Sequence, residues 1–360
     1  MLHLDSGDCF QGAIVFNEFV GAAEMRTLTA AGLDAAVVGN HEFDASAENL
    51  AKQYGAWGGF AFLAANYTFE SSSEPWATAL GDMVQPSTLF DLDGLRVGVV
   101  GLGNVSSLNS IYDESNSMGI RVSEPEEVLP AEAAKLRSQG ADIVIALSHM
   151  GMDDDIELAE EIPGIDLFVG GHHHVALNPP IVVENAHSGA RIPVVHSGAF
   201  SKFVGRLDVV IRDGALLSHS YQLFAVDNTV PQDPEVMDIL EEYGDALDSL
   251  YDTSQVIAYA GETLTRYGSV GGDSMLGNFT ADAMRFYPGV ETEISLTNTL
   301  GIRADISEGD ITVDDLYNSM PFDNTITTMF LSGREVQELL DYVAERSTER
   351  GCNSQAQVAG

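Results

Sequence analysis

The sequence predicts an α/β protein built from two domains that a short helical linker joins. Short apolar runs alternate with amphipathic stretches through the first two-thirds of the 360 residues, which is the pattern of a layered α/β domain. A proline-bounded break at Pro231-Gln232-Asp233-Pro234 interrupts this pattern. Further helical and strand patterns follow the break, and the chain length alone suggests two or three domains of ordinary size.

In the first domain, short apolar runs predict strands and amphipathic stretches predict helices. The expected strands are Leu33–Val38, Phe60–Ala65, Val97–Leu102, Ile143–Leu147, Ile165–Val169 and Ile192–Val195. The expected helices are Phe16–Ala31, Ala45–Tyr54, Glu126–Ser138 and Asp153–Glu161. Near the end of this domain, a hairpin is expected because Phe203–Ile211 and Ala215–Phe224 flank the turn signal Asp213-Gly214.

The break divides the chain into a first domain over residues 1–230, a linker helix within 231–252 and a second domain over 253–360. The linker helix is expected from Glu235 to about Tyr251, with Asp233 as its cap. The second domain is expected to contain a helix at Met275–Phe286, a strand at Glu293–Thr297, a helix at Arg334–Glu345 and a polar tail at Ser354–Gly360.

The charge of the chain is strongly acidic, with 55 acidic residues against 16 basic ones and a net charge of −39. These acids are spread through segments with folded patterns, so the composition does not indicate disorder. A dispersed acidic surface favours a protein that works in high salt, where self-repulsion is screened. An ordinary acidic protein is the alternative. Nucleic acid is not expected as a partner, because phosphate backbones require basic patches.

Other compositional signals are negative. No apolar run reaches the roughly 18 residues that a transmembrane helix needs, and no signal-peptide pattern opens the chain. Cys9 and Cys352 lie far apart, so they form neither a disulfide framework nor a zinc-finger spacing.

Four strand-like runs each end in a cluster of glycine with aspartate, asparagine or histidine. Because ligands bind beyond the carboxyl ends of strands in α/β sheets, these four clusters are expected to converge on one point. The clusters are Asp5-Ser6-Gly7-Asp8, Gly39-Asn40-His41-Glu42-Phe43-Asp44, Ser148-His149-Met150-Gly151 and Gly170-Gly171-His172-His173-His174.

The residue types in these clusters fit a divalent metal centre. Carboxylate, amide oxygen and imidazole together suit Zn²⁺, Mn²⁺, Fe²⁺ or a related ion. Considered alone, each residue has another interpretation: Asp8 could cap a helix, Asn40 could belong to a turn and His149 could be a buried histidine. The repetition of the pattern after four strands favours the metal site. In an extended loop, His172 and His174 can face the same side.

These clusters resemble those of the calcineurin-like metallophosphoesterases, and Gly39-Asn40-His41-Glu42 is the most specific of them. The continuation Phe43-Asp44 and the segment Asp5–Gly12 narrow the resemblance to the 5′-nucleotidase family. The resemblance implies a four-layer α/β/β/α metallophosphoesterase domain followed by a smaller α/β C-terminal domain. In the second domain it rests on Leu276–Ala283, Asn298–Arg303 and Met320-Pro321-Phe322.

The resemblance implies two divalent metal ions. Asp8 resembles the carboxylate that bridges the two ions. Asn40, His149 and His172 resemble the other ligands of one ion, and His174 resembles a ligand of the second ion.

The resemblance also implies the residues that act on the substrate. His41, oriented by Asp44, resembles the catalytic pair that steadies charge near the transferred phosphoryl group. For one of the substrate residues, Phe322, a core aromatic is the alternative interpretation. The residues that resemble contacts to the nucleotide are Asn298, Gly301, Arg303 and Phe322.

The implied function is hydrolysis of nucleotide phosphoesters, foremost 5′-nucleotidase activity through attack of a metal-bound hydroxide. A 2′,3′-cyclic-nucleotide 2′-phosphodiesterase, a nucleotide-sugar hydrolase and an inactive binding remnant are the alternatives. The family also implies an extracellular or periplasmic location.

The chain departs from the family pattern at three places. No Asp-x-His motif precedes Asp8, and His3 is not expected to replace it. We therefore expect a chain shortened at its start, and also at its end, because the second aromatic of the family's base clamp is absent before Gly360. Of the arginines that the family places before Leu276, Arg266 is present, while Gly271-Gly272-Asp273 occupies the nearer position.

Overall fold

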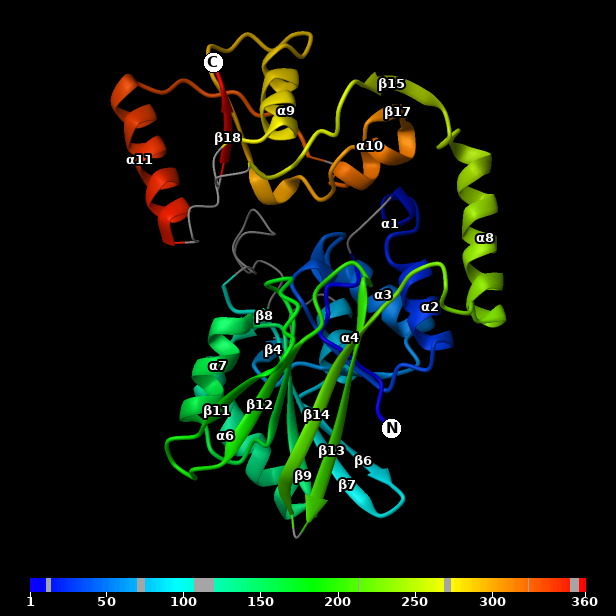
Figure 1. Cartoon of the computed structure of the whole chain (residues 1–360), viewed down its shortest axis with the longest axis vertical. Helices are drawn as coiled ribbons and strands as arrows, with labels where there is room; N and C mark the ends of the chain where they lie inside the picture. The colour runs from blue at the N-terminus through cyan, green and yellow to red at the C-terminus, as the bar shows by residue number, and fades with distance from the viewer. Residues whose placement is uncertain are drawn as a thin grey trace. The chain divides into compact units, whose positions relative to one another are not determined.

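The computed structural model (Figure 1) describes residues 1–10, 14–69, 75–106, 120–212, 214–268, 273–322, 324–349 and 356–360. It divides into two compact units, one of Met1–Gln11 with Val20–Glu242 and one of Gly12–Phe19 with Tyr243–Gly360. Both contain helices and strands, which confirms the predicted α/β class. The predictions made for Asp213, Gly271, Gly272, Cys352 and Ser354 fall outside the described residues.

The first unit contains two sheets. The smaller one is parallel in the order β1-β2-β3-β5, and the larger one has the order β11-β12-β10-β9-β7-β6 with antiparallel edge strands. The smaller sheet consists of β1 (Leu4–Asp5), β2 (Ala35–Val37), β3 (Ala61–Leu63) and β5 (Val84–Gln85). The larger sheet consists of β6 (Ser87–Leu92), β7 (Leu95–Leu102), β9 (Ile143–Ser148), β10 (Leu167–Gly170), β11 (Ile181–Glu184) and β12 (Arg191–His196).

The two sheets face each other across a shared apolar core. Val37 and Leu63 of the smaller sheet pack in one buried cluster with Val99, Ile145 and Leu147 of the larger sheet. Alternate side chains of a strand point to opposite faces of its sheet. The outer face of each sheet is therefore also apolar and is covered by helices. These helices are α2 (Ala22–Ala30), α3 (Ala47–Trp57) and α4 (Pro75–Met83) on one side and α6 (Pro125–Ser138) and α7 (Met152–Glu161) on the other (Figure 1).

Each outer face has its own packing. On the smaller sheet, Tyr54 of α3 stacks on Phe62 of β3 with ring centroids 4.9 Å apart. On the larger sheet, Leu136 of α6 and Leu158 of α7 join Val144 in a buried cluster. The order helix, sheet, sheet, helix confirms the predicted four-layer architecture.

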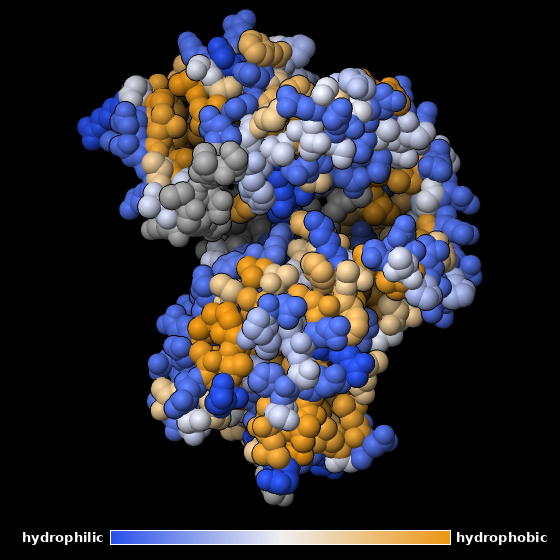
Figure 2. Space-filling model, viewed as in Figure 1, coloured by the Kyte–Doolittle hydropathy of each residue, from blue (hydrophilic) through white to orange (hydrophobic). Residues whose placement is uncertain are grey.

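A long hairpin of β13 (Phe203–Arg212) and β14 (Ala215–Ala225) adds to the shared core. Leu207 and Tyr221 pack against that core, while Val210 and Leu217 are exposed. Figure 2 shows an apolar patch over the lower part of this hairpin. The hairpin was expected from the sequence, and Gly214 takes the positive φ of 73° that a tight turn uses. A separate antiparallel pair joins β4 (Tyr67–Phe69) to β8 (Ile120–Val122).

The prediction of one helix over Phe16–Ala31 is wrong. Two helices occupy this stretch, α1 (Ile14–Phe19) and α2, and the chain breaks between them where Val20 and Gly21 have φ values of 46° and 99°. A Cβ on Gly21 would lie 2.3 Å from the ring of Phe10. The positive φ and this close approach both require glycine at position 21. The apolar periodicity of Phe16–Ala31 therefore continues across a break between two helices.

Helix α8 (Pro234–Leu250) follows the proline-bounded break. Its capping prediction is confirmed, because the Asp233 carboxylate accepts hydrogen bonds from the N–H groups of Glu235 at 2.9 Å and Val236 at 3.3 Å. The division of the chain into two compact units falls within this helix, between Glu242 and Tyr243. The predicted domain limits at residues 230 and 253 stay predictions.

The second unit contains two antiparallel strand pairs, β15 with β17 and β16 with β18. The predicted polar tail at Ser354–Gly360 is wrong for its described part, because β18 pairs with β16 and buries Ala356 and Gln357. The strands are β15 (Val256–Ala260), β16 (Ser295–Asn298), β17 (Gly309–Thr312) and β18 (Ala356–Ala359), and the helices are α9 (Met275–Arg285), α10 (Val313–Ser319) and α11 (Gly333–Glu349). None of the helices in the described ranges combines the length and apolar character that a membrane crossing requires.

Candidate metal centre

Three of the predicted ligands come together in the first unit. Asp8 follows β1, His149 follows β9 and His172 lies two residues after β10. One ligand atom from each of these side chains lies within 4.8 Å of the other two. This spacing is what one ion bound by all three would need, and the residues belong to three of the four predicted clusters.

Asp8 and His149 form a close pair. The Nε2 atom of His149 lies 2.8 Å from Oδ2 of Asp8. Its Nδ1 atom hydrogen-bonds to the carbonyl oxygen of Ser6, and since a carbonyl only accepts, the proton sits on Nδ1. A backbone partner on one ring nitrogen leaves the other suited to bind a metal.

The electrostatics of this pair favour a cation beside Asp8. Burial alone would raise the pKa of Asp8, but the charge and hydrogen bond of His149 and the backbone N–H of His41 hold that pKa below its ordinary value. Burial alone would lower the pKa of His149, and the Asp8 carboxylate raises it to about 9. Burial and the neighbouring His149 lower the pKa of His172 to about 3. The neutral imidazole of His172 is the form that binds a metal.

Asn40 provides an independent sign that the residues fit a metal. The residue is 5% exposed, and its Oδ1 atom is buried without a hydrogen-bond partner among the residues that the structure describes. Buried amide oxygens in folded proteins almost always have a partner. An oxygen of this kind, at the end of β2 and next to His41, suits an oxygen-binding divalent ion.

Glu42 organises the loops that carry these residues, a role that the sequence analysis missed. Its fully buried carboxylate accepts hydrogen bonds from the N–H groups of Asp8 at 3.0 Å, Cys9 at 2.7 Å and Gly39 at 2.6 Å. The carboxylate therefore ties the loop after β1 to the loop after β2. Burial raises the pKa of Glu42. Its place inside the cluster at 39–44 was the available signal.

A second missed residue supports His149 from the larger sheet. Asn104 is fully buried, and its side-chain amide donates to the carbonyl oxygen of His149 at 3.2 Å. It lies beyond β7, where Gly103-Asn104 repeats the glycine-with-amide pattern of the other clusters. The strand-end rule could therefore have identified it.

His41 and Asp44 form the predicted side-chain pair. Nδ1 of His41 lies 2.7 Å from Oδ2 of Asp44, across the short 3₁₀ helix His41–Phe43. The backbone N–H of His41 donates to Oδ1 of Asp8 at 2.8 Å. This bond places the His41–Asp44 pair beside the acidic ligand.

The loop after β10 differs from the extended loop expected for His172 and His174. Both residues have left-handed backbones, with φ values of 71° and 57°, which is uncommon for residues other than glycine. His174 is exposed and lies outside the three-residue ligand group, with its ring 5.2 Å from that of Phe200. His173 accepts a hydrogen bond at Nδ1 from the Met152 N–H at 3.1 Å.

The predicted nucleotide contacts lie in the second unit. Oδ1 of Asn298 accepts from the N–H of Gly301 at 2.9 Å, which closes the 3₁₀ turn Thr299–Gly301. The Arg303 guanidinium lies over the ring of Phe322, 5.4 Å from its centroid. This contact is a cation–π arrangement on a half-buried ring. Phe322 is therefore not a fully buried core residue.

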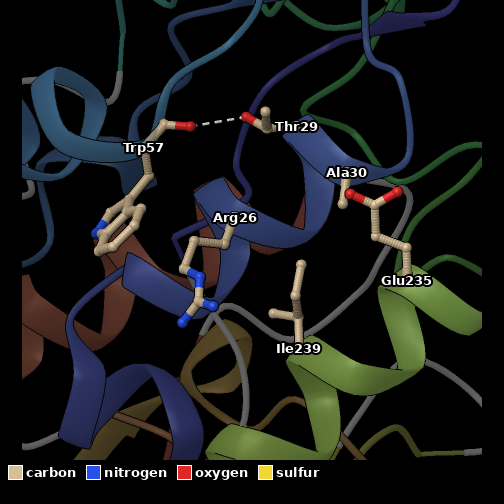
Figure 3. A pocket seen from close by; sticks show the side chains of 6 residues that line it. All are labelled: Arg26, Thr29, Ala30, Trp57, Glu235 and Ile239. Carbon is tan, nitrogen blue, oxygen red and sulfur yellow. Dashed lines mark hydrogen bonds between the residues drawn. The ribbon is translucent and has the colours of Figure 1, made fainter.

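A pocket of about 290 Å³ lies elsewhere in the first unit, between α2, the end of α3 and α8. Figure 3 shows Arg26 between Trp57 and Ile239, and its guanidinium lies 5.0 Å from the Trp57 ring centroid. The same guanidinium is bound by the carboxylate of Glu242 at 2.8 Å. None of the six residues that line this pocket is a predicted site residue.

Comparison with known proteins agrees with the fold. The family profile for calcineurin-like phosphoesterases matches residues 2–176, and the profile for the 5′-nucleotidase C-terminal domain matches residues 253–360. The solved structure of a 5′-nucleotidase precursor from Thermus thermophilus is 30% identical, with a TM-score of 0.88 over 100% of this chain and 72% of that one.

Curated relatives extend the likeness. The trifunctional nucleotide phosphoesterase protein YfkN of Bacillus subtilis is 27% identical over 99% of this chain, and the mouse (Mus musculus) 5′-nucleotidase is 28% identical over 96%. The chain spans 26% of the length of the first relative and 63% of the second. The ligand group, the four-layer fold and these likenesses agree: the chain belongs to the 5′-nucleotidase family of calcineurin-like metallophosphoesterases.

Proposed function

We propose that this chain hydrolyses nucleotide phosphoesters with the help of divalent metal ions, and that nucleoside 5′-monophosphates are its main substrates. The observation that carries the proposal is the group formed by Asp8, His149 and His172. The His41–Asp44 pair is joined to that group by the hydrogen bond from the His41 N–H to Asp8. The unpartnered oxygen belongs to Asn40, the residue before His41.

Two ions are proposed, in line with the sequence analysis. Asp8, Asn40, His149 and His172 would hold one ion, and Asp8 would share the second ion with His174. A divalent ion bound in this way lowers the pKa of a bound water and neutralises charge on phosphate oxygens. The protein's own task is to hold carboxylate, amide and imidazole at ligand spacing and to keep them buried.

His41 is proposed to act on the phosphoryl group. Asp44 holds Nδ1 of the ring, which fixes the ring orientation and stabilises a protonated imidazole. An imidazolium beside the ligand group would donate to a phosphoryl oxygen as its negative charge grows. This is stabilisation of charge in the transition state, and fixed donors of this kind contribute several kcal/mol in low-dielectric sites.

Asn298, Gly301, Arg303 and Phe322 are proposed to hold the nucleoside. The half-buried ring of Phe322 offers a stacking surface for a base. A 2′,3′-cyclic-nucleotide or nucleotide-sugar substrate is the second candidate, favoured by the relative named a trifunctional nucleotide phosphoesterase. The exposure of His174 favours a third candidate, a binding protein without turnover. The location outside the cytoplasm and the high-salt habitat also stay proposals.

The test is release of phosphate from AMP, with 2′,3′-cyclic AMP and UDP-glucose as competing substrates. We expect turnover of AMP in the presence of Mn²⁺ or Zn²⁺, loss of turnover in EDTA, and no turnover by Asp8→Ala. Faster hydrolysis of a competing substrate would replace the proposed specificity. Metal binding without hydrolysis of any of the three would support the binding protein instead.

A further inference from the structure

A second pair of buried titratable side chains lies beneath the loop that carries His172. Asp155 is in α7 and His196 ends β12, and both side chains are buried, with exposures of 0% and 2% for the two residues. Oδ2 of Asp155 lies 2.8 Å from Nε2 of His196. The function proposed above gives these residues no role.

This pair is in direct contact with the end of β10. Gly170 is the register partner of His196 on β12 and of Ser148 on β9. A Cβ on Gly170 would lie 1.9 Å from Oδ2 of Asp155 and 2.2 Å from Nε2 of His196. The hydrogen-bonded pair therefore fills the place of a side chain at Gly170, two residues before His172, and the neighbouring strand leads from Ser148 into His149.

Helix α7 connects the same pair to both ligand loops. The helix begins at Met152, three residues after His149, and the Asp155 N–H donates to the carbonyl of Gly151 at 3.0 Å. The Met152 N–H donates to His173 at 3.1 Å. The first turn of α7 is thus held by the loop after β9, by the loop after β10 and, through Asp155, by β12.

The alternative is that the Asp155–His196 pair only stabilises the fold. A buried carboxylate–imidazole pair has a desolvation cost that offsets most of its attraction. Here Oδ1 of Asp155 and Nδ1 of His196 are also buried without a hydrogen-bond partner among the described residues. Two buried polar atoms without partners cost free energy, so the pair contributes little to stability. Its contacts instead reach the loop of His149 and the loop of His172.

We propose that Asp155 and His196 are positioning residues of the metal centre. Their hydrogen bond fixes α7 to β12 under Gly170 and so sets the distance between the loops of His149 and His172. The inference rests on the proposed metal function, and it adds two residues that do not touch the ion. Residues that orient metal ligands from outside the ligand group typically change metal affinity by 10–100-fold when replaced.

The experiment compares two amide side chains of different length at position 196. His196→Gln keeps an amide donor at about the position of Nε2, whereas the shorter amide of His196→Asn cannot reach Asp155. We expect His196→Asn and Asp155→Leu to weaken Mn²⁺ binding at least about 10-fold, and His196→Gln to bind like the unchanged chain. Free Mn²⁺ is measured by electron paramagnetic resonance during titration of the full-length chain.

A matched control comes from the opposite end of β10. Asp166 also joins a helix to the larger sheet, because it binds Arg137 of α6 and accepts from the Val144 N–H at 2.7 Å. Asp166→Leu should lower the melting temperature of the metal-free protein without changing Mn²⁺ affinity. Asp155→Leu should lower both quantities.

Three outcomes decide between the hypotheses. Equal Mn²⁺ affinity of His196→Asn and His196→Gln would overturn the positioning role. So would an effect of Asp155→Leu that is confined to the melting temperature, as for Asp166→Leu. If the unchanged chain fails to bind Mn²⁺ or Zn²⁺ at all, the proposed metal centre itself is wrong and the positioning role fails with it.

Discussion

His41 is the side chain whose replacement should separate metal binding from chemistry. It donates its backbone N–H to Asp8, and its ring is held by Asp44 outside the three-residue ligand group. We expect His41→Ala to lower kcat on AMP by at least about 100-fold while the bound metal per chain is unchanged. Asp8→Ala should lose both the activity on AMP and the bound metal. Equal loss of metal in the two variants would refute this division of roles.

Glu24 predicts a pH dependence of stability. Burial raises its pKa from 4.5 to about 7, and its buried Oε2 has no hydrogen-bond partner among the described residues. The folded state then binds more protons than the unfolded state between these two values. The free energy of unfolding therefore falls as the pH rises through that window.

Replacing Glu24 with its amide removes this dependence. Glu24→Gln should raise the free energy of unfolding at pH 8 by about 2 kcal/mol and have little effect at pH 4. Glu48→Gln, at an exposed position in the first turn of α3, controls for the lost charge. Urea denaturation at both pH values measures the difference, and a gain of equal size at pH 4 would rule out the titration of Glu24 as its cause.

Single residues of the centre were predictable when they follow a strand. The structure brings Asp8, His149 and His172 together, as the strand-end pattern predicted, because a polar residue after a strand lies at the sheet edge. The metal roles of these residues and of Asn40 stay predictions. Glu42 was visible in its cluster, but its role depends on backbone N–H groups 33 and 34 residues away in the chain. Asp155 and His196 are 41 residues apart in the chain, and no local sequence pattern predicts a contact between them.

At the scale of whole elements, the four inner strands of the larger sheet (β7, β9, β10 and β12) were predicted, and its edge strands β6 and β11 were not. The apolar runs of the inner strands are continuous because both faces are buried. The break between α1 and α2 was not predictable from periodicity, since it depends on the ring of Phe10 against Gly21. Strand β18 was missed for a similar reason, because its polar sequence becomes a strand only by pairing with β16, about 60 residues earlier in the chain.

Gln357 explains why that polar strand is buried, and it predicts the cost of disturbing it. Oε1 accepts from the Ser274 N–H at 2.9 Å, and Nε2 donates to Oγ1 of Thr299 at 3.0 Å. The side chain thus joins β18 to the start of α9 and to the turn after Asn298. Gln357→Met keeps the length and leaves both partners unsatisfied, so it should cost about 2 kcal/mol.

The matched control for Gln357 is Gln337, which is exposed on α11. Gln337→Met should change the free energy of unfolding by less than about 0.5 kcal/mol. If Gln357 also holds the proposed nucleoside loop, Gln357→Met should raise KM for AMP more than it lowers kcat. Urea denaturation and steady-state kinetics on the same preparations test both statements, and an unchanged KM would limit Gln357 to stability.

At the scale of the molecule, the 55 acidic residues far outnumber the 16 basic residues that could pair with them. Among the described residues, the ion pairs of lysine and arginine include Arg26 with Glu242, Lys135 with Glu132, Arg137 with Asp166, Arg206 with Asp208 and Arg334 with Glu338. Except in the partly buried Arg137–Asp166 pair, at least one partner is exposed, and exposed pairs contribute only about 0–1 kcal/mol each. With a net charge of −39, mutual repulsion of the remaining carboxylates therefore outweighs the attraction within the pairs.

This balance predicts that salt stabilises and activates the protein. Screening shortens the range of repulsion from about 10 Å at 0.1 M salt to about 3 Å at 1 M, and it weakens the few attractive pairs at the same time. Because the unpaired acids dominate, the free energy of unfolding should rise between about 0.1 M and 2 M KCl. An anionic nucleotide approaches the same field, so kcat/KM for AMP should rise over the same range.

The measurement needs a cosolute that stabilises proteins without screening charge. Sucrose at matched osmolality should raise the melting temperature but leave kcat/KM for AMP unchanged, because excluded cosolutes favour compact states without shortening the range of charge repulsion. KCl should raise both quantities. If kcat/KM and the melting temperature both peak below about 0.2 M KCl, where the range of repulsion is still about 7–10 Å, then the acidic surface is not an adaptation to high salt. A rise in kcat/KM with sucrose equal to that with KCl would mean that stability, and not electrostatic approach of the substrate, limits turnover.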